Sequence, residues 1–256
     1  MKLKDTGERL IVYDDSVNSP NYLRHKIAYV FAEKFIRDKD VLDNGAGSGY
    51  GAYHLAVSGA RKVVGIDISK EAVEYARQRY SSKNLEFRTE DAAKLSFDDK
   101  TFDVLTSFQV IEHIRDIDNF LREVVRVLKK PGIALISTPN KKIYSPNGPN
   151  PFHIKEFYPN EFNNLLKIYF DEVEILGAGQ NAKVNEFEES RKHSFRKRFE
   201  DLLKKFHLLF LLNMIPKQIV CFFSKRFHKN INISDFQITS ADVENCPDLI
   251  AICRKK

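Results

Sequence analysis

A run of glycines near the start of the chain constrains the fold more than any other feature. It reads DVLDNGAGSGYG over residues 40–51, so a short apolar run leads into Asp43 and then into glycine at every second position, at Gly45, Gly47 and Gly49. This pattern is typical of a buried strand that runs into a tight turn and then a helix. Glycine suits such a turn because the backbone must adopt a positive φ or let a ligand approach closely. The N–H groups at the start of the helix favour an electronegative ligand group.

The spacing of the glycines argues against two common nucleotide sites. A dinucleotide fingerprint requires glycine where the chain has Tyr50, and a P-loop requires Gly-Lys-Ser/Thr, which is absent from the turn. A second signal lies about 20 residues further on, where the strand predicted over residues 62–67 ends in Asp67. An acidic side chain at this place can accept hydrogen bonds from both hydroxyls of an adenosine ribose. The two signals together favour a nucleoside ligand other than NAD or ATP.

With these motifs the chain resembles the class I S-adenosylmethionine-dependent methyltransferases, of the type 11 kind. In that family the first acid and the glycine turn face the amino-acid end of the cofactor, Asp67 faces the ribose, and an acid with a small residue, here Asp91 and Ala92, meets the adenine. The resemblance implies S-adenosylmethionine as cofactor, with S-adenosylhomocysteine as product. It assigns the following residues to cofactor binding: Asp43, Gly45, Ala46, Gly47, Gly49, Asp67, Ile68, Asp91, Ala92, Phe108, Gln109, Tyr22 and His25.

The N-terminal region carries the resemblance to one bacterial branch of the family. That branch has a TGER stretch, here at residues 6–9, and a helix of the form Tyr-x-x-His-x-x-x-Tyr that covers the cofactor; the matching residues are Tyr22 and His25. We expect this helix over residues 22–36, with Asn21 as its cap. Helical spacing predicts that the following side chains face the core: Leu23, Ile27, Val30, Phe31 and Phe35.

The remaining pattern alternates strands and helices, which predicts an α/β fold with a doubly wound parallel sheet. Further strands are expected over residues 85–88, 102–108, 133–137, 170–177 and 248–254, and further helices over 50–57, 71–80, from Asp116 or Asp118 to Lys129, and from Pro159. The resemblance implies a seven-stranded, Rossmann-like methyltransferase sheet with an antiparallel last strand. The predicted organisation is an N-terminal arm and cap helix (1–39), a cofactor-binding core (40–177), a basic, partly helical insert between strands six and seven (178–247) and the final core strand (248–256).

The charge of the chain is concentrated in the predicted insert. The 256 residues carry a net charge of +6, but residues 191–229 hold eleven lysines and arginines against two acids, which leaves −3 for the remainder. Apolar side chains are interleaved with these charges over residues 195–227. This segment is compatible with a dimer contact, an active-site lid, a lipid-surface helix or, less favoured, phosphate contacts to RNA.

The location of the protein is predicted from its cysteines and apolar runs. Three cysteines without paired spacing argue against a disulfide scaffold and against C-x-x-C zinc sites. The first ten residues show no apolar leader, and no run reaches the roughly 18 apolar residues of a membrane span. We expect a cytoplasmic protein, or one held peripherally at the inner face of the membrane.

Three residues are candidates for the chemistry itself. A hydroxyl acceptor must lose its proton, and a base with a pKa near neutrality serves this best. Glu112 and His113 follow the fourth strand, where such a base should stand, and His153 in the loop after the fifth strand could reach the same space. Some family members hold a divalent ion with Glu-x-x-Glu-His. Gln109 replaces the first of these acids, so a metal is possible but not favoured.

The acceptor is less well defined than the cofactor. The motifs STPN at residues 137–140 and NPFH at 150–153 resemble enzymes that methylate sugars of surface polysaccharides or other small metabolites. The first hypothesis is therefore methyl transfer to a hydroxyl of a sugar or glycolipid-like small molecule. The alternatives are a membrane-associated enzyme acting on quinone or lipid precursors, an RNA methyltransferase that uses the basic insert, and a protein that binds the cofactor without turnover.

Overall fold

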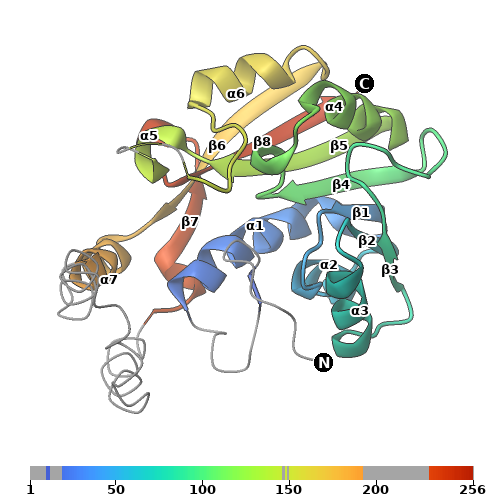
Figure 1. Ribbon diagram of the computed structural model, residues 1–256, viewed down its shortest axis with the longest axis horizontal. Helices are drawn as coiled ribbons and strands as arrows, with labels where there is room; N and C mark the ends of the chain where they lie inside the picture. Colours follow the sequence, from blue (N-terminus) through green and yellow to red (C-terminus); the bar gives the residue numbers. More distant parts are fainter. Residues whose placement is uncertain (1–9, 12–18, 146–147, 149, 193–230, 256) are drawn as a thin grey trace.

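The computed structural model describes residues 10–11, 19–145, 148, 150–192 and 231–255 (Figure 1). The TGER stretch and the basic segment at 195–227 lie outside the described residues. The strands are β1 (Asp40–Asn44), β2 (Lys62–Asp67), β3 (Leu85–Thr89), β4 (Phe102–Phe108), β5 (Leu128–Pro139), β6 (Glu172–Gln180), β7 (Phe236–Thr239) and β8 (Asp248–Lys255). The helices are α1 (Pro20–Ile36), α2 (Tyr50–Val57), α3 (Lys70–Arg79), α4 (Ile117–Val127), α5 (Lys141–Tyr144), α6 (Pro159–Leu166) and α7 (Ala182–Lys192).

These strands form one sheet with the order β3-β2-β1-β4-β5-β8-β6-β7. Strands β1 to β5 are parallel, whereas β8 lies antiparallel between β5 and β6. This arrangement confirms the predicted doubly wound sheet with an antiparallel final strand. The connections change direction between β1 and β4. Ligands of such sheets bind at this switch point, outside the carboxyl ends of the strands.

The predicted number of seven strands is wrong by one. The additional strand, β7, comes from the predicted insert and pairs antiparallel with residues 177–180 of β6. Strand β6 accordingly runs to Gln180, three residues beyond its expected end. A strand of four residues is too short to show the alternation by which strands are recognised in a sequence. The predicted insert therefore contains the end of β6 and helix α7, and it returns to the sheet as β7 before β8.

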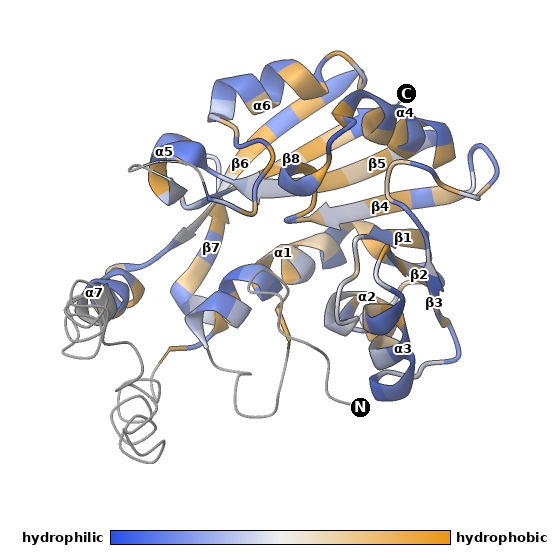
Figure 2. Cartoon of the chain, viewed as in Figure 1, coloured by the Kyte–Doolittle hydropathy of each residue, from blue (hydrophilic) through white to orange (hydrophobic). Residues whose placement is uncertain are grey.

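Two helical layers cover the sheet, and each side has its own hydrophobic core (Figure 1). On one side, Ile36 of α1, Leu55 of α2 and Val73 of α3 are at most 2% exposed. On the other side, α4 and α6 contribute Phe120 and Phe162, which are fully buried. Figure 2 shows the apolar residues concentrated along the strands and on the helix faces turned toward them. Burial of these two surfaces stabilises the sheet and fixes its carboxyl edge.

Helix α1 begins two residues before the expected position. Its N-cap is Ser19 rather than Asn21, because the Ser19 hydroxyl accepts a hydrogen bond from the N–H of Tyr22 at 3.2 Å. Pro20 follows in the first turn, where its missing N–H removes no helical hydrogen bond. The Ser-Pro pair is thus the start signal that the prediction overlooked.

The face of α1 that packs on the sheet also differs from the predicted one. Leu23 is buried as expected, but the other predicted core residues, at positions 27, 30, 31 and 35, are only partly buried. Tyr29, Ala32 and Ile36 are at most 5% exposed. The small alanine side chain lets the helix approach the strands closely, whereas periodicity alone favoured the bulkier phenylalanines.

The boundary between α4 and β5 is a second correction. Helix α4 is capped by Asp116, one of the two expected caps, but it ends at Val127 rather than Lys129. Strand β5 begins at once with Leu128. Residues 131–132 lie in an irregular part of the pairing between β5 and β4. Proline, which has no backbone N–H, is tolerated at such a bulge because the ladder requires no donor there.

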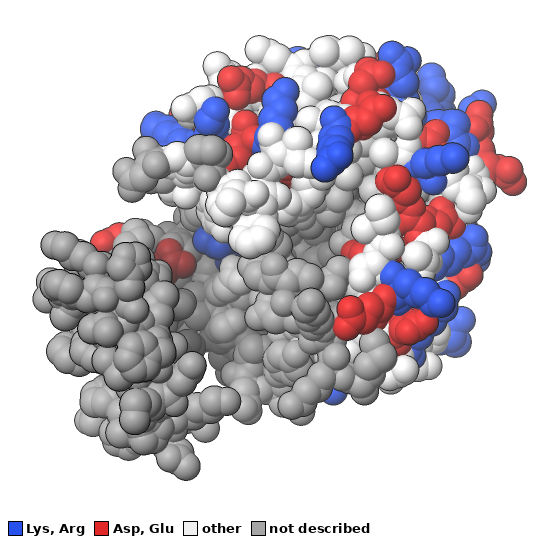
Figure 3. Space-filling view, viewed as in Figure 1, with Lys and Arg blue, Asp and Glu red and all other residues white. Residues whose placement is uncertain are grey.

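The described surface carries charges of both signs. On the face shown in Figure 3, basic and acidic side chains are interspersed on the right-hand side of the molecule. Some of them pair along a helix, as Arg122 does with Asp118 at 2.7 Å. Among the described helices, none combines the length and the apolar composition that a membrane span requires.

Candidate active site

The glycine turn after β1 is held against the end of β2. The N–H groups of Gly45 and Ala46 donate hydrogen bonds to the carbonyl of Ile66 at 2.9 and 2.7 Å. Gly45 has a φ of +90°, and a Cβ at this position would lie 2.3 Å from a methyl carbon of Val110. Only glycine therefore allows the turn to pass under the segment that follows β4. Helix α2 then starts at Tyr50, with Gly49 in the left-handed region at its N-cap.

Asp43, at the carboxyl end of β1, is a buried carboxyl group with two hydroxyl donors. It is 1% exposed, and its Oδ1 accepts hydrogen bonds from Thr106 Oγ1 at 2.8 Å and from the Tyr29 hydroxyl at 3.3 Å. The Tyr29 ring can reach this carboxyl because it crosses Gly51, where a Cβ would lie 1.9 Å from Cζ of the ring. Burial raises the pKa of Asp43 to about 7, and the nearby charge of Asp67 acts in the same direction. The carboxyl is therefore prepared for a positively charged partner.

Asp67, at the end of β2, closes the other side of the turn. Its Oδ2 accepts a hydrogen bond from the N–H of Gly47 at 2.9 Å, and its Oδ1 accepts one from the N–H of Ser69 at 2.8 Å. The next side chain, Ile68, is 72% exposed. An exposed apolar side chain beside a fixed carboxylate provides a surface on which a ring can pack while its hydroxyls bind the acid.

The loop after β3, which contains Asp91 and Ala92, is tied to both neighbouring elements. Asp91 is exposed, and its carboxylate accepts a hydrogen bond from the N–H of Ala93. The carbonyl of Ala92 accepts one from Asn44 Nδ2 at 3.4 Å. Asn44 thus connects the glycine turn to this loop. Its Oδ1 is buried without a hydrogen-bond partner in the described structure.

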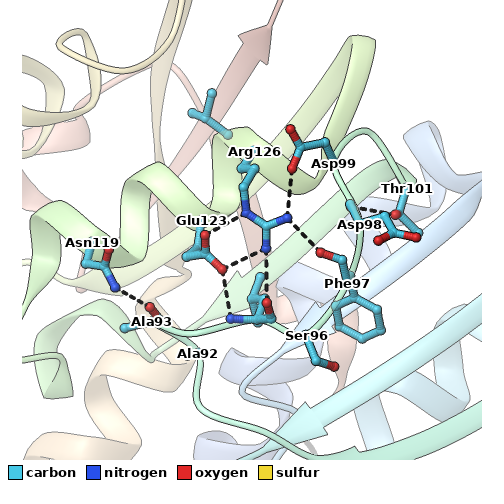
Figure 4. Close-up of polar contacts among 12 residues, drawn as sticks. Ala92, Ala93, Ser96, Phe97, Asp98, Asp99, Thr101, Asn119, Glu123 and Arg126 are labelled. Carbon is cyan, nitrogen blue, oxygen red and sulfur yellow. Dashed lines mark hydrogen bonds and ion pairs between the residues drawn. The ribbon is translucent and has the colours of Figure 1, made fainter.

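Helix α4 holds the far end of the same loop through Arg126, whose contacts Figure 4 shows. The guanidinium donates to the carbonyls of Phe97 at 2.7 Å and Leu95 at 3.0 Å, and it pairs with Asp99 at 2.9 Å. Glu123 binds the same guanidinium and also accepts from the N–H of Leu95 at 2.8 Å. The position of the loop therefore depends on side chains of α4, among which Arg126 makes the most contacts.

An aromatic wall stands over the glycine turn. The Tyr29 ring lies edge-on to Phe108 at 4.9 Å between centroids and to Tyr50 at 5.5 Å, and Tyr22 reaches Tyr50 at 5.5 Å. Tyr22 also belongs to a buried apolar cluster with Val184, Phe187, Ile231 and Phe236, which all lie within the predicted insert. His25, on the same helix, has its pKa lowered to about 3, chiefly by burial and also by the neighbouring Arg24, so it is neutral.

The three candidate catalytic residues come together, as the sequence predicts. Glu112 and His113 lie in a 3₁₀ turn (Ile111–His113) after β4, and His153 reaches them from the loop before α6. The two imidazole rings are 5.1 Å apart between centroids. One ligand atom from each of the three residues lies within 4.8 Å of the others, a spacing that could hold a cation. Glu112 Oε2 also accepts a hydrogen bond from Thr138 Oγ1 at 3.1 Å.

Hydrogen bonds define which nitrogen of each histidine is basic. His113 Nδ1 lies 3.1 Å from the carbonyl of Phe152. A carbonyl only accepts hydrogen bonds, so Nδ1 carries the proton and Nε2 is the basic nitrogen. His153 Nδ1 lies 2.8 Å from Glu156 Oε1, and its Nε2 lies 3.3 Å from the side-chain amide of Asn150. Glu156 belongs to the same sequence motif as His153, three residues further on, but no role is predicted for it from the sequence.

Comparison with known proteins identifies the family. A family model described as a methyltransferase domain matches residues 37–193, which include the glycine turn and the histidines. The chain belongs to the class I S-adenosylmethionine-dependent methyltransferases. Members of this family use S-adenosylmethionine, a nucleoside with a positively charged sulfonium and an α-ammonium group.

Individual relatives agree with this assignment. A probable S-adenosylmethionine-dependent methyltransferase of Mycobacterium tuberculosis is 38% identical over 164 residues, which are 63% of this chain and 58% of that protein. A probable methyltransferase of Mycolicibacterium smegmatis is 37% identical over 189 residues, 72% of this chain and 71% of that protein. The chain thus spans less than two-thirds of the M. tuberculosis relative.

A solved structure shows the same fold over almost the whole chain. A methyltransferase of Thermotoga maritima, described as a possible histamine N-methyltransferase, has a TM-score of 0.59 at 16% identity, with 92% of each chain covered. At this identity the likeness concerns the fold alone, and the acceptor must be argued from the site itself.

The side chains at the switch point of this methyltransferase fit its cofactor. Asp43 and Asp67 offer carboxylates to a ligand that carries positive charge and a ribose, and Ile68 offers an apolar surface to an adenine ring. Two contributors were not predicted, Tyr29 and Thr106, both of which donate to Asp43. Tyr29 could have been found, since it is the final tyrosine of the helix motif from Tyr22. Thr106 could not, because a threonine within a buried strand carries no signal of its own.

Proposed function

We propose that the protein transfers the methyl group of S-adenosylmethionine to a hydroxyl of a small molecule, such as a sugar or a glycolipid-like acceptor. The observation that carries this proposal is the orientation of His113. Its Nδ1–H is held by the carbonyl of Phe152, which makes Nε2 the basic nitrogen. A neutral imidazole placed in this way suits an alcohol, which must lose a proton as it is methylated.

The cofactor would lie along the carboxyl edge of β1, β2 and β4. Its ammonium group would face Asp43, its ribose hydroxyls Asp67, and its adenine Ile68 and the loop at Asp91 and Ala92. Tyr22 and His25 would cover it from α1, with Phe108 and Gln109 beneath the reacting end. When bound, S-adenosylmethionine supplies an electrophilic methyl carbon on its sulfonium.

The residues of the chain would then contribute position and proton transfer. His113 Nε2 would take the proton of the acceptor hydroxyl. His153, held by Glu156 at 2.8 Å, would fix the far side of the acceptor, and Glu112 would favour the protonated imidazole of His113. Holding donor and acceptor in line provides a large part of the rate, since it removes the entropy cost of their encounter.

The test of this function is a comparison of acceptors with wild type and a His113→Ala variant. Methyl transfer from S-[methyl-³H]adenosylmethionine would be measured with neutral methyl hexosides, catechol and primary amines as probes. We expect transfer to a hydroxyl probe, and a loss of about 100-fold or more in kcat for His113→Ala, as is usual for a lost general base. Affinity for S-adenosylhomocysteine should stay unchanged in the variant. Transfer only to amines, or an unaffected rate in His113→Ala, would contradict the proposal.

A further inference from the structure

A second polar cluster lies at the carboxyl edge of the sheet, on the side covered by α1. Asp248, the first residue of β8, pairs with Pro139 at the end of β5 and with Ala178 near the end of β6. It is 5% exposed, and its Oδ2 lies 3.4 Å from Nε of Arg24 on α1. Burial raises the pKa of Asp248, and Gln109 is close enough to act in the opposite direction by favouring the ionised form. The cluster therefore lies close to the residue that follows β4.

Two buried atoms of this cluster have no hydrogen-bond partner among the residues that the structure describes. Arg24 Nε is buried and makes no hydrogen bond, although a carboxylate oxygen lies 3.4 Å away. Gln180 Oε1 is likewise buried and unpartnered, while its Nε2 donates to Glu188 at 2.9 Å. Ala178 of β6 pairs with Asp248, so these two residues share a face of the sheet. Gln180 lies two residues further along β6 than Ala178, so its side chain lies on the same face as that of Asp248. Buried polar atoms without partners are costly, which indicates a group that is still to be bound.

The charges of the cluster determine which chemical group of a ligand could bind the two unpartnered atoms. Arg24 Nε requires an acceptor, whereas Gln180 Oε1 and Asp248 require donors. A carboxylate or phosphate would satisfy Arg24 but would be repelled by Asp248 and Glu188. An ammonium group would satisfy the acids but would be repelled by Arg24. A hydroxyl both donates and accepts, so hydroxyls satisfy all these atoms without placing a further charge in a buried site.

The cluster continues toward the histidines. The Arg24 guanidinium lies over the ring of Tyr144, 5.9 Å from its centroid. Tyr144 in turn stacks on His153 at 5.7 Å, and His153 meets His113 at 5.1 Å. These contacts form a row of side chains that begins at His113 and passes through His153 and Tyr144. A molecule with one hydroxyl at His113 would lie beside this row, and Arg24 and Asp248 stand at its other end.

We propose that Arg24, Asp248 and Gln180 form the acceptor subsite of this methyltransferase, and that they bind hydroxyls of a neutral, polyhydroxylated molecule of the carbohydrate class. The inference rests on the proposed transfer to a hydroxyl and names the substrate class for the same site. The hydroxyl to be methylated lies at His113, and neighbouring hydroxyls bind the buried guanidinium, carboxylate and amide. These three residues select the acceptor and take no part in proton transfer.

The test measures acceptor binding separately from chemistry. Protein saturated with S-adenosylhomocysteine would be titrated with four neutral methyl hexosides (gluco, galacto, manno and rhamno). It would also be titrated with a matched charged pair, methyl glucuronoside and methyl glucosaminide. The variants are Arg24→Lys, Asp248→Asn and Gln180→Met, each of which keeps the size of its side chain. Arg122→Lys and Asp118→Asn, an exposed pair on the outer face of α4, serve as matched controls.

We expect wild type to bind at least one neutral hexoside more tightly than either charged probe. Each subsite variant should weaken that binding by about tenfold, as for the loss of a hydrogen bond to a buried charged group. The controls should not weaken it, and the affinity for S-adenosylhomocysteine should stay the same throughout. Absence of hexoside binding, preference for a charged probe, or binding that the folded variants leave unchanged would overturn the subsite. Failure of wild type to bind S-adenosylhomocysteine would instead overturn the proposed function.

Discussion

The carboxyl group of Asp43 lies in an environment that favours a positively charged ligand. It is buried at the end of β1, and burial together with the charge of Asp67 raises its pKa to about 7. The hydrogen bonds from Thr106 and Tyr29 favour the ionised form but do not outweigh burial. The group is thus partly protonated at neutral pH and gains most from a cationic ligand. The position of Asp43 at the end of a strand could be predicted from the sequence, but its protonation state depends on how the side chain is packed.

The first prediction concerns the pH dependence of cofactor binding. Because the ammonium group of S-adenosylhomocysteine pairs with ionised Asp43, we expect affinity to rise from pH 6 to pH 8 and binding near pH 7 to release a proton. Asp43→Asn should bind more weakly at pH 8 and lose this dependence. Calorimetry in buffers of different ionisation enthalpy measures both quantities. Equal pH profiles for wild type and Asp43→Asn would contradict the assignment.

The raised pKa of Asp43 lowers the stability of the ligand-free protein as pH rises. The pKa of Asp43 is higher in the folded state than the ordinary value of 3.8. The unfolded chain therefore releases its proton first as pH rises, and this group lowers the free energy of unfolding between pH 4 and about pH 7. Asp43→Asn should remove that contribution, which urea unfolding at pH 5 and pH 7 would show.

At the scale of the element, the loop after β3 depends on α4 more than on its own sequence. Arg126 binds two loop carbonyls, at Phe97 and Leu95, and pairs with Glu123 and Asp99. Arg126→Leu should lower the free energy of unfolding by about 2–3 kcal/mol, since two hydrogen bonds from a charged group are lost. It should also weaken binding of S-adenosylhomocysteine, because the loop carries Asp91 and Ala92.

The control for this prediction lies on the same helix. Arg122 pairs with Asp118 at 2.7 Å on the exposed face of α4, and such surface pairs contribute about 0–1 kcal/mol. Arg122→Leu should therefore change neither unfolding nor binding appreciably. Equal effects of the two substitutions, measured by urea unfolding and calorimetry, would contradict the role given to Arg126.

The elements themselves were predictable to different degrees. Strands with long apolar runs, such as β4, and helices with a clear cap, such as Ser69 before α3, follow from local pattern. The core face of α1 did not, because the choice between Tyr29 and Phe31 depends on which side chain can cross Gly51. Strand β7 could not be predicted from local pattern either, because four residues show no distinctive period and the pairing with β6 depends on the tertiary structure.

At the scale of the whole molecule, the sheet gathers residues from distant segments at one edge. The glycine turn, Asp67 and His113 could be predicted, because each lies at or shortly after the end of a strand and strand ends share an edge. His153 reaches the same edge from the loop that precedes α6. The Arg24–Asp248 pair could not, because it joins α1 to the first residue of β8. The position of that residue is defined only once β8 enters between β5 and β6.

The proposed cofactor site holds the nucleoside between the glycine turn and the end of β2. The most direct measurement is calorimetric titration of S-adenosylhomocysteine into wild type and an Asp67→Ala variant, with folding checked by circular dichroism. We predict that wild type binds and that Asp67→Ala binds at least about tenfold more weakly, because the ribose hydroxyls lose a charged acceptor. An affinity that is the same in a folded Asp67→Ala variant would contradict the account.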